Sequence, residues 1–300
     1  YILRGTIMIY LTFFVFSVLR GLNAIAVKMA QKDYVKKLHD SIYFTILFSF
    51  FQLIFLFLIP PLNGYTFRLD MLVYPGFFAI FYLISYVLLM NALKEGPTSL
   101  TNVIYSFQSI VPIVVGLIIW KENIGIFQFI GLILFIVVLF LFNNGSYSQG
   151  TITKKITLKW ALLASFCTLA VGIAVIFTKQ YMLTYDGFIK EYLILYNAFV
   201  VLFGIPYLLI SSIKYKQKLI LNKKFLFYTA SPALITDITN IIYMLYITKF
   251  KSAFFFPLMS ILNILSVVFF SWILLKERIS KTAYVGIVLS FVAIYLLGIK

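Results

Sequence analysis

Long apolar segments separated by short polar ones dominate the pattern of this chain. A helix needs about 20 apolar residues to cross a hydrocarbon core about 30 Å thick. Ten runs of that kind cover residues 5–29, 41–60, 71–93, 97–120, 124–142, 158–183, 188–212, 225–249, 252–275 and 280–298. The short-period alternation of a membrane β-barrel is absent from the sequence, and a helix satisfies its backbone polar groups within its own segment. The pattern predicts an all-α integral membrane protein with ten transmembrane helices.

The chain also contains an internal repeat. Lys121-Glu122 recurs as Lys276-Glu277, at an offset of 155 residues, and each pair ends one apolar run and precedes the next. Further matches at this offset are Lys94 with Lys249, Gln108 with Asn263, Ile124 with Ile279 and Gly131 with Gly286. Earlier in each half the offset is 151, which places Gly21, Ile25 and Lys28 on Gly172, Ile176 and Lys179.

We therefore predict a first five-helix repeat over residues 1–142, a linker over 143–157 and a second five-helix repeat over 158–300. Because each repeat has an odd number of helices, the second copy must enter the membrane from the opposite side. The two repeats are then inverted about a pseudo-two-fold axis in the membrane plane.

Composition agrees with the membrane assignment and disfavours several kinds of site. The chain is 63% hydrophobic and 11% charged, with a mean hydropathy of +1.03, more apolar than a water-soluble domain tolerates. The single cysteine, Cys167, excludes a disulfide framework or a thiolate metal cluster within one chain. The single histidine, His39, leaves no histidine-based triad or metal site. We expect no metal, no cofactor and no enzymatic activity.

The net charge of +16 does not indicate nucleic acid as a partner. The basic residues are scattered over short loops between the apolar runs, where they meet lipid headgroups. We therefore expect membrane lipids, and no nucleic acid, around these residues.

Two charges lie inside the predicted spans. Arg20 is well within the first run, and Asp237 is about a dozen residues from either end of the eighth, which is the midplane for a rise of about 1.5 Å per residue. An isolated charge there costs on the order of 3 kcal/mol or more, so each should face a partner or a cavity.

Three interpretations of this pair remain open. The two residues form a structural ion pair. Alternatively, they bracket a solute, with Arg20 on a carboxylate and Asp237 on an ammonium, which predicts an amino acid or related zwitterion. In the third, Asp237 alone binds a proton and a cationic solute in alternation.

Polar and aromatic residues on neighbouring spans extend this candidate site. Asn23 follows Arg20 by one turn, Asn240 follows Asp237 by one turn, and Asn102 and Gln108 belong to a polar stretch of the fourth run. Tyr82 and Tyr86 share a face of the third span and suit an amine through cation–π attraction, although packing also explains such aromatics. The candidate substrate-binding or coupling residues are Arg20, Asn23, Tyr82, Tyr86, Asn102, Gln108, Asp237, Asn240 and Asn263.

Several short motifs together resemble one known superfamily. They are the Gly-x-Asn-x-x-x-x-Lys stretch from Gly21 to Lys28, the unit from Lys121-Glu122 to Gly131, its copy from Lys276-Glu277 to Gly286, and the segment Ser252–Pro257 that opens the ninth span. In this order, over essentially the whole chain, they resemble the drug/metabolite transporter superfamily, specifically its ten-helix members with two tandem EamA-type repeats. Members commonly have tryptophan where Arg20 stands, so this wall of the pocket differs in charge.

The resemblance implies a secondary active transporter that moves a small polar organic metabolite by alternating access through a cavity between inverted repeats. Our best guess for the solute is an amino acid or related zwitterion. The alternative is a proton-coupled exporter of cationic amines or drugs. A proton or a counter-substrate is the expected coupling partner, and a monomer is compatible with the architecture.

The resemblance also implies a multi-pass protein of the plasma membrane in which the fifth and tenth helices pack together. Gly131 and Gly286 suit that contact because small residues let helices approach closely in lipid. Orientation stays open. The family places both termini in the cytoplasm, whereas the distribution of basic residues between the loops favours external termini.

Overall fold

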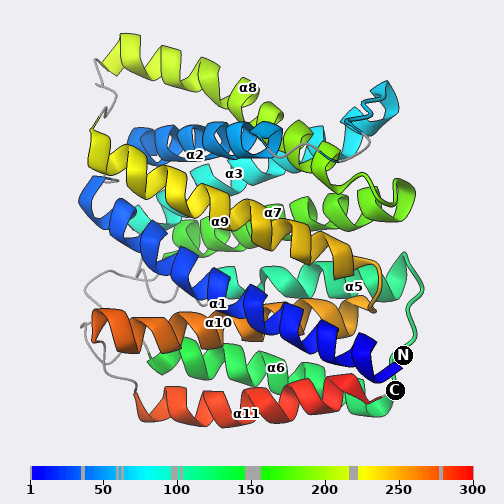
Figure 1. Cartoon of the computed structure of the whole chain (residues 1–300). Coiled ribbons are helices and arrows are strands. Elements are labelled where there is room, and N and C mark those ends of the chain that lie inside the picture. The colour runs from blue at the N-terminus through cyan, green and yellow to red at the C-terminus, as the bar shows by residue number, and fades with distance from the viewer. Residues whose placement is uncertain are drawn as a thin grey trace. The chain divides into compact units, whose positions relative to one another are not determined.

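The computed structural model describes residues 2–34, 38–58, 61, 64–95, 101, 104–145, 157–215, 222–276 and 280–299, and this part contains helices and no strand. The helices, labelled in Figure 1, are α1 (Ile2–Tyr34), α2 (Leu38–Leu58), η1 (Leu69–Leu72), α3 (Val73–Glu95), η2 (Phe107–Ser109), α5 (Ile110–Ile118), α6 (Ile126–Gly145), α7 (Leu158–Thr184), α8 (Ile189–Tyr215), α9 (Lys223–Ile247), α10 (Ser252–Leu275) and α11 (Lys281–Gly298).

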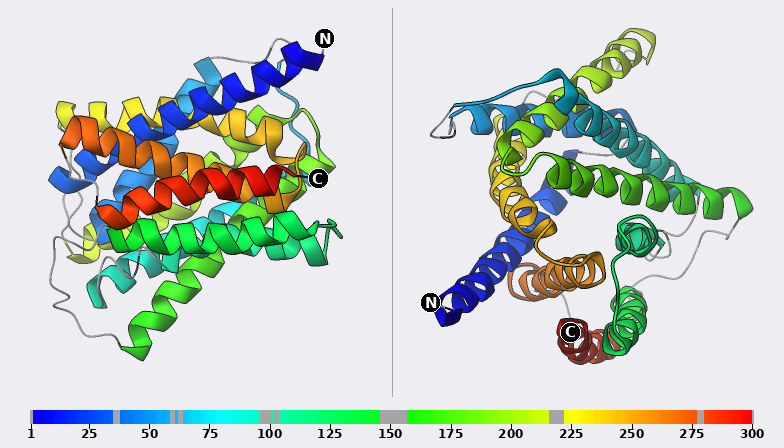
Figure 2. Two further views of the ribbon diagram at one scale, coloured as in Figure 1. Left: turned by 90° about the horizontal axis from the view of Figure 1, so that it is seen from below. Right: turned by 90° about the vertical axis from the view of Figure 1, so that its right-hand side faces the viewer.

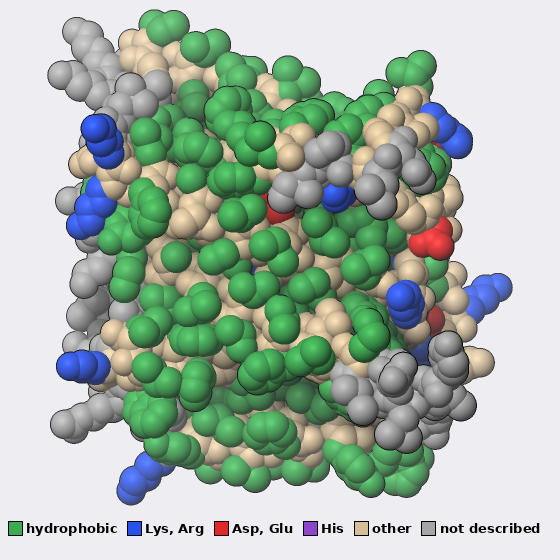
Figure 3. All heavy atoms as spheres, viewed as in Figure 1, with side chains coloured by type: hydrophobic (Ala, Val, Ile, Leu, Met, Phe, Trp, Pro, Cys, Tyr) green, Lys and Arg blue, Asp and Glu red, His purple; other side chains and the backbone are tan. Residues whose placement is uncertain are grey.

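These helices confirm the all-α, ten-span prediction. Within the described residues, 8 helices are long and apolar enough to cross a membrane. Two shorter apolar helices, Ile104–Ile118 and Ile126–Phe142, lie within the fourth and fifth predicted spans. Hydrophobic side chains dominate the face seen in Figure 3, and the Lys and Arg side chains visible there lie mostly at the ends of the helices.

The chain forms two compact units. Unit 1 contains residues 1–83 and 177–246, and unit 2 contains residues 84–176 and 247–300. Each unit therefore combines segments from both predicted repeats, and α3 and α7 each contribute to both units. The division of the chain into two sequence repeats remains a prediction, because the boundaries of the compact units differ from those of the repeats.

In unit 1, α2 packs closely against α8. The ring Nδ1 of His39 lies 2.7 Å from the hydroxyl of Ser211. One to two turns further on, a Cβ built on Gly204 would lie 2.5 Å from the side chain of Ile46. The pairings run in opposite directions along the two helices, so α2 and α8 are antiparallel.

In unit 2, α6 packs along α11, and both views of Figure 2 show the two helices side by side. A Cβ built on Gly131 would lie only 2.8 Å from Cγ of Leu297, and one on Gly286 would lie 3.4 Å from Cβ of Leu141. Both glycines thus face the partner helix, which confirms the predicted contact between the fifth and tenth spans. The contact continues into a buried apolar cluster of Phe135, Val138, Leu139, Phe142, Ile261, Ala283 and Ala293.

The repeated lysines share an uncommon backbone conformation. Lys121 has φ 51° and Lys276 has φ 54°, the left-handed region that non-glycine residues rarely adopt. Lys276 is the C-cap of α10, and a left-handed residue at that place stops a helix. The prediction that the Lys-Glu pairs end helices is confirmed for Lys276, whereas Lys121 lies three residues beyond the end of α5 at Ile118. Glu277 lies outside the described residues.

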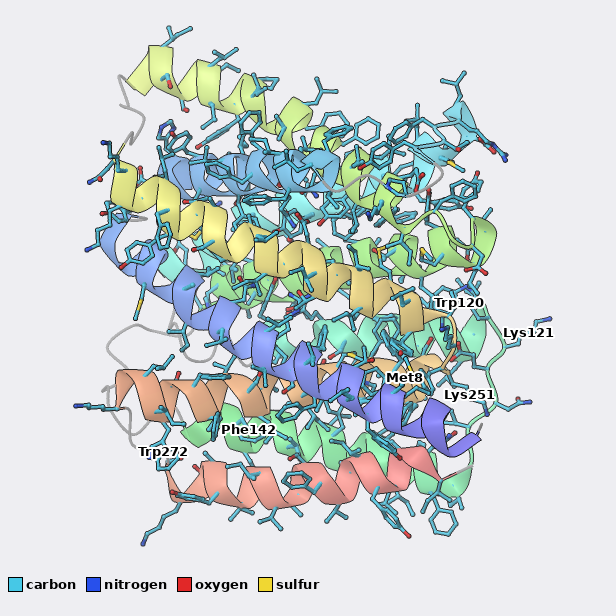
Figure 4. All side chains as sticks on the ribbon, in the orientation of Figure 1. Met8, Trp120, Lys121, Phe142, Lys251 and Trp272 are labelled. Carbon is cyan, nitrogen blue, oxygen red and sulfur yellow. The ribbon has the colours of Figure 1, made fainter. Side chains whose placement is uncertain are left out.

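Glu122 has a role that helix termination does not describe. Its Oε2 accepts from the backbone N–H of Ser252 at 2.5 Å, and its Oε1 accepts from the Ser252 hydroxyl at 3.1 Å. Lys251 Nζ in turn donates to the carbonyl of Asn123 at 2.6 Å. Figure 4 shows Lys121 and Lys251 at the same end of the helices. Glu122 therefore caps α10, where a carboxylate also complements the positive end of the helix dipole.

We expect Glu122→Ala to lower the free energy of unfolding by about 1 kcal/mol, the usual cost of removing a helix cap. Glu122→Gln keeps one acceptor oxygen and should retain most of that stability. Thermal unfolding of the purified protein in detergent measures both changes. If the alanine variant unfolded at the wild-type temperature, Glu122 would not be a stabilising cap.

Candidate functional site

The charge on α1 meets α9 within unit 1. Arg20 Nη2 donates to Asn240 Oδ1 at 2.8 Å, and the guanidinium lies 5.4 Å from the centroid of the Phe16 ring. Asn240 Nδ2 donates to the hydroxyl of Tyr196 on α8 at 3.1 Å. The half-buried guanidinium therefore has a neutral amide as its polar partner.

Asp237 is buried on the same helix, with 3% of its surface exposed. Its Oδ1 accepts from Gln52 Nε2 of α2 at 2.8 Å. Its Oδ2 is shielded from solvent and has no hydrogen-bond partner among the described residues. One face of the carboxylate is therefore held in place and the other is free to accept a donor.

Arg20 and Asp237 are both described, and no ion pair joins them. The structure thus contradicts the interpretation that the two charges serve only as a mutual salt bridge. Asn240 occupies the place at the guanidinium that the carboxylate would take, although Asp237 and Asn240 are separated by less than one helical turn.

Contacts along the whole length of α1 and α9 fix their relative placement. Asn23 Nδ2 donates to Thr236 Oγ1 at 3.0 Å, one turn from the Arg20 contact. Aromatic pairs continue the same register at both ends: Phe13 with Tyr246 and Tyr34 with Phe225, each with ring centroids 5.1 Å apart. Positions on α9 fall as those on α1 rise, so the helices are antiparallel, as Figure 1 shows.

Aromatic rings lie beside these charges. Tyr82 stacks on Phe78 with centroids 5.6 Å apart, and Phe78 contacts Tyr196 at 4.8 Å. Tyr82, Tyr196 and Tyr243 lie within electrostatic reach of the Arg20 guanidinium. Tyr82 therefore belongs to the same cluster as the charged pair.

The structure brings together five of the predicted site residues in unit 1: Arg20, Asn23, Tyr82, Asp237 and Asn240. Three others belong to unit 2. Tyr86 and Gln108 are half-buried there, and Asn263 is exposed on α10. Asn102 lies outside the described residues.

Sequence reasoning missed three residues of this cluster, Gln52 on α2 and Tyr196 and Asn197 on α8. Gln52 is 2% exposed and Asn197 is fully buried. Each amide is an isolated polar residue within an apolar run that carries no charge in its central part. An amide within an apolar run indicates a site of polar contact between helices, because a buried amide in a membrane helix needs a hydrogen-bond partner.

We expect Gln52→Leu to cost about 2 kcal/mol of stability, because it leaves Asp237 Oδ1 buried without a donor. The same change in an Asp237→Leu background should cost much less, since the carboxylate is gone. Thermal unfolding of the four proteins gives this double-mutant cycle. Additive effects would show that Gln52 does not act through Asp237.

Comparisons with known proteins agree with this fold. Residues 7–144, from α1 through α6, match the model of the EamA-like transporter family. Among the 28 matching chains of solved structures is a crystal structure with a TM-score of 0.70 and 12% sequence identity, covering 97% of this chain and 96% of that chain. At this identity the likeness shows the fold alone. No curated protein matches the sequence.

The helices define the class: this is a multi-pass integral membrane protein. The first part of the chain, residues 7–144, is thus similar to the EamA-like transporter family. Surrounding lipid is the environment that such helices imply.

Proposed function

We propose that this chain is a secondary active transporter of a small zwitterionic metabolite, such as an amino acid, that works by alternating access between its inverted repeats. The observation that carries the proposal is a half-buried cation and a buried anion in the same unit, neither of which compensates the other. Arg20 has an amide as its polar partner, and Asp237 retains a free oxygen.

A zwitterion supplies the two missing charges. A guanidinium binds a carboxylate through two parallel hydrogen bonds, and an amide oxygen cannot replace that geometry. An ammonium donates directly to the free Oδ2 of Asp237. Because an uncompensated intramembrane charge costs several kcal/mol, a solute carrying both charges gains binding energy from each end.

The alternative is a proton-coupled exporter of cationic amines. The rings of Phe78, Tyr82 and Tyr196 near the charges favour a cation through their π faces. In that mechanism, Asp237 binds a proton and the amine in turn, and Arg20 does not touch the solute. The coupling partner, a proton or a counter-substrate, is part of the proposal in either case, and the sequence has no nucleotide-binding motif for ATP.

Ligand-induced stabilisation of the purified protein tests the choice. Amino acids, amines and nucleotide sugars would be screened by thermal shift on wild type, Arg20→Gln and Asp237→Asn. We expect stabilisation by zwitterions that both substitutions abolish. Stabilisation by amines that only Asp237→Asn abolishes would support the alternative. Binding that survives both substitutions would contradict a role for the two charges.

A further inference from the structure

Unit 1 contains buried oxygen acceptors that have no donor among the described residues. Among the described residues, Asn23 Oδ1, Asn197 Oδ1 and Asp237 Oδ2 are shielded from solvent and have no hydrogen-bond partner. Leaving a buried polar atom unpaired is unfavourable, so native structures keep few of them. Three oxygen acceptors without donors indicate that a donor-rich group completes this region.

The bonds around two of these oxygens determine which atom is free. Asn197 Nδ2 donates to the carbonyl of Leu193 at 2.9 Å, and a carbonyl only accepts, so Oδ1 is the unpaired end of that amide. Gln52 likewise must present its Nε2 to the Asp237 carboxylate. Rotating either amide would place two acceptors against each other. Both free oxygens therefore follow from chemistry rather than from a choice of orientation.

The hydroxyl of Tyr196 connects these groups. It accepts from Asn240 Nδ2 at 3.1 Å, and the side chains of Asp237 and Asn197 lie within reach of it. The ring of Tyr196 packs against that of Phe78, with centroids 4.8 Å apart. The Asp237 carboxylate, the Asn197 side-chain amide and an aromatic wall thus lie around one hydroxyl.

We propose that Asp237 Oδ2 and Asn197 Oδ1, beside the Tyr196 hydroxyl, form a subsite for the primary ammonium group of the solute. This proposal rests on the proposed function and assigns to α8 a share of a site that sequence reasoning placed elsewhere. A primary ammonium has three N–H donors for these acceptors. Because both oxygens are shielded from solvent, the solute reaches them through the helix movements of alternating access.

This subsite should bind a primary ammonium group and reject a quaternary one. A site that hydrogen-bonds N–H groups strongly rejects an analogue that lacks them, because its own acceptors are then left unpaired. An aromatic cage without such acceptors has no reason to reject a quaternary ammonium. A trimethylated amino acid, or betaine, keeps the charge and the carboxylate but has no N–H, so it separates the two cases.

The test measures binding of an amino acid and of its N,N,N-trimethyl derivative, using the amino acid that stabilises the wild-type protein most. We expect wild type to prefer the amino acid by about 100-fold. Asn197→Leu should weaken amino acid binding by about 10-fold or more and change betaine binding little. Asn197→Ala is the second variant if the leucine variant does not fold.

Tyr192→Phe is the matched control. It removes a buried hydroxyl from the same helix, one turn earlier, whose partner is Thr178 at 2.7 Å rather than the subsite. We expect it to bind both ligands within about threefold of wild type. Equal wild-type affinity for the amino acid and the betaine, or an Asn197 variant that behaves like Tyr192→Phe, would overturn the subsite alone. Absence of binding by any zwitterion would overturn the proposed function together with the subsite.

Discussion

Replacing Asp237 by asparagine is expected to lower the initial rate of solute uptake into proteoliposomes by about 100-fold or more. Asparagine preserves the shape of the side chain and still accepts from Gln52, so packing changes little. It removes the negative charge that would bind the ammonium or the proton. A hydrogen bond to a charged group is worth about 1.5 to 3 kcal/mol, and at about 1.4 kcal/mol per tenfold this accounts for most of the loss.

Asp70→Asn is the control for this experiment. Asp70 also lies in unit 1, but it is exposed and pairs with Arg68, whose Nε donates to it at 3.0 Å. Exposed ion pairs contribute little, so we expect wild-type uptake from this variant. Uptake by Asp237→Asn within about threefold of wild type would show that the intramembrane charge is not needed for transport.

Gly131→Ala is expected to be strongly destabilising, whereas the same change at its repeat partner Gly286 should be tolerated. A methyl group on Gly131 would meet the Leu297 side chain at 2.8 Å and the Leu297 backbone nitrogen at 3.1 Å. The backbone cannot rotate away as a side chain can, so α6 and α11 would have to separate. Overpacking of this kind costs about 1 to 3 kcal/mol.

The space around the other glycines provides the controls. At Gly286 the nearest atom would be 3.4 Å away, and at Gly125, just before α6, no atom lies within 4 Å. Unfolding temperatures in detergent should therefore fall clearly for Gly131→Ala and little for the other two variants. An equal loss at all three positions would indicate a general effect of helix composition and not of the α6–α11 contact.

The spans and their close contacts were predictable because they depend on local properties. Length and hydropathy alone predict where a helix can cross lipid, and the repeat spacing by itself pairs Gly131 with Gly286 as small residues on equivalent helices. The position of Lys276 at the end of an apolar run likewise indicates the end of a helix, and Lys276 is the C-cap of α10. The break of the fourth span into η2 and α5 lies next to Pro112, which cannot donate the backbone N–H that a continuous helix needs.

The partners of the buried polar groups were not predictable in the same way. The opposite charges of Arg20 and Asp237 suggest an ion pair. Instead, the antiparallel register of α1 and α9 places Asn240 at the guanidinium, and α2 places Gln52 at the carboxylate. That register depends on side-chain packing over the full helix length. A search for charges alone also passes over Gln52 and Asn197, whose amides become informative once their burial is known.

Counterflow in proteoliposomes tests most directly whether this protein transports a zwitterion that binds at its two intramembrane charges. Proteoliposomes loaded with an unlabelled amino acid would be presented with the labelled compound, for wild type and for Arg20→Gln. The account predicts saturable uptake that internal amino acid accelerates and that the Arg20 substitution abolishes. Wild-type counterflow of amines that excludes amino acids and persists in Arg20→Gln would contradict it.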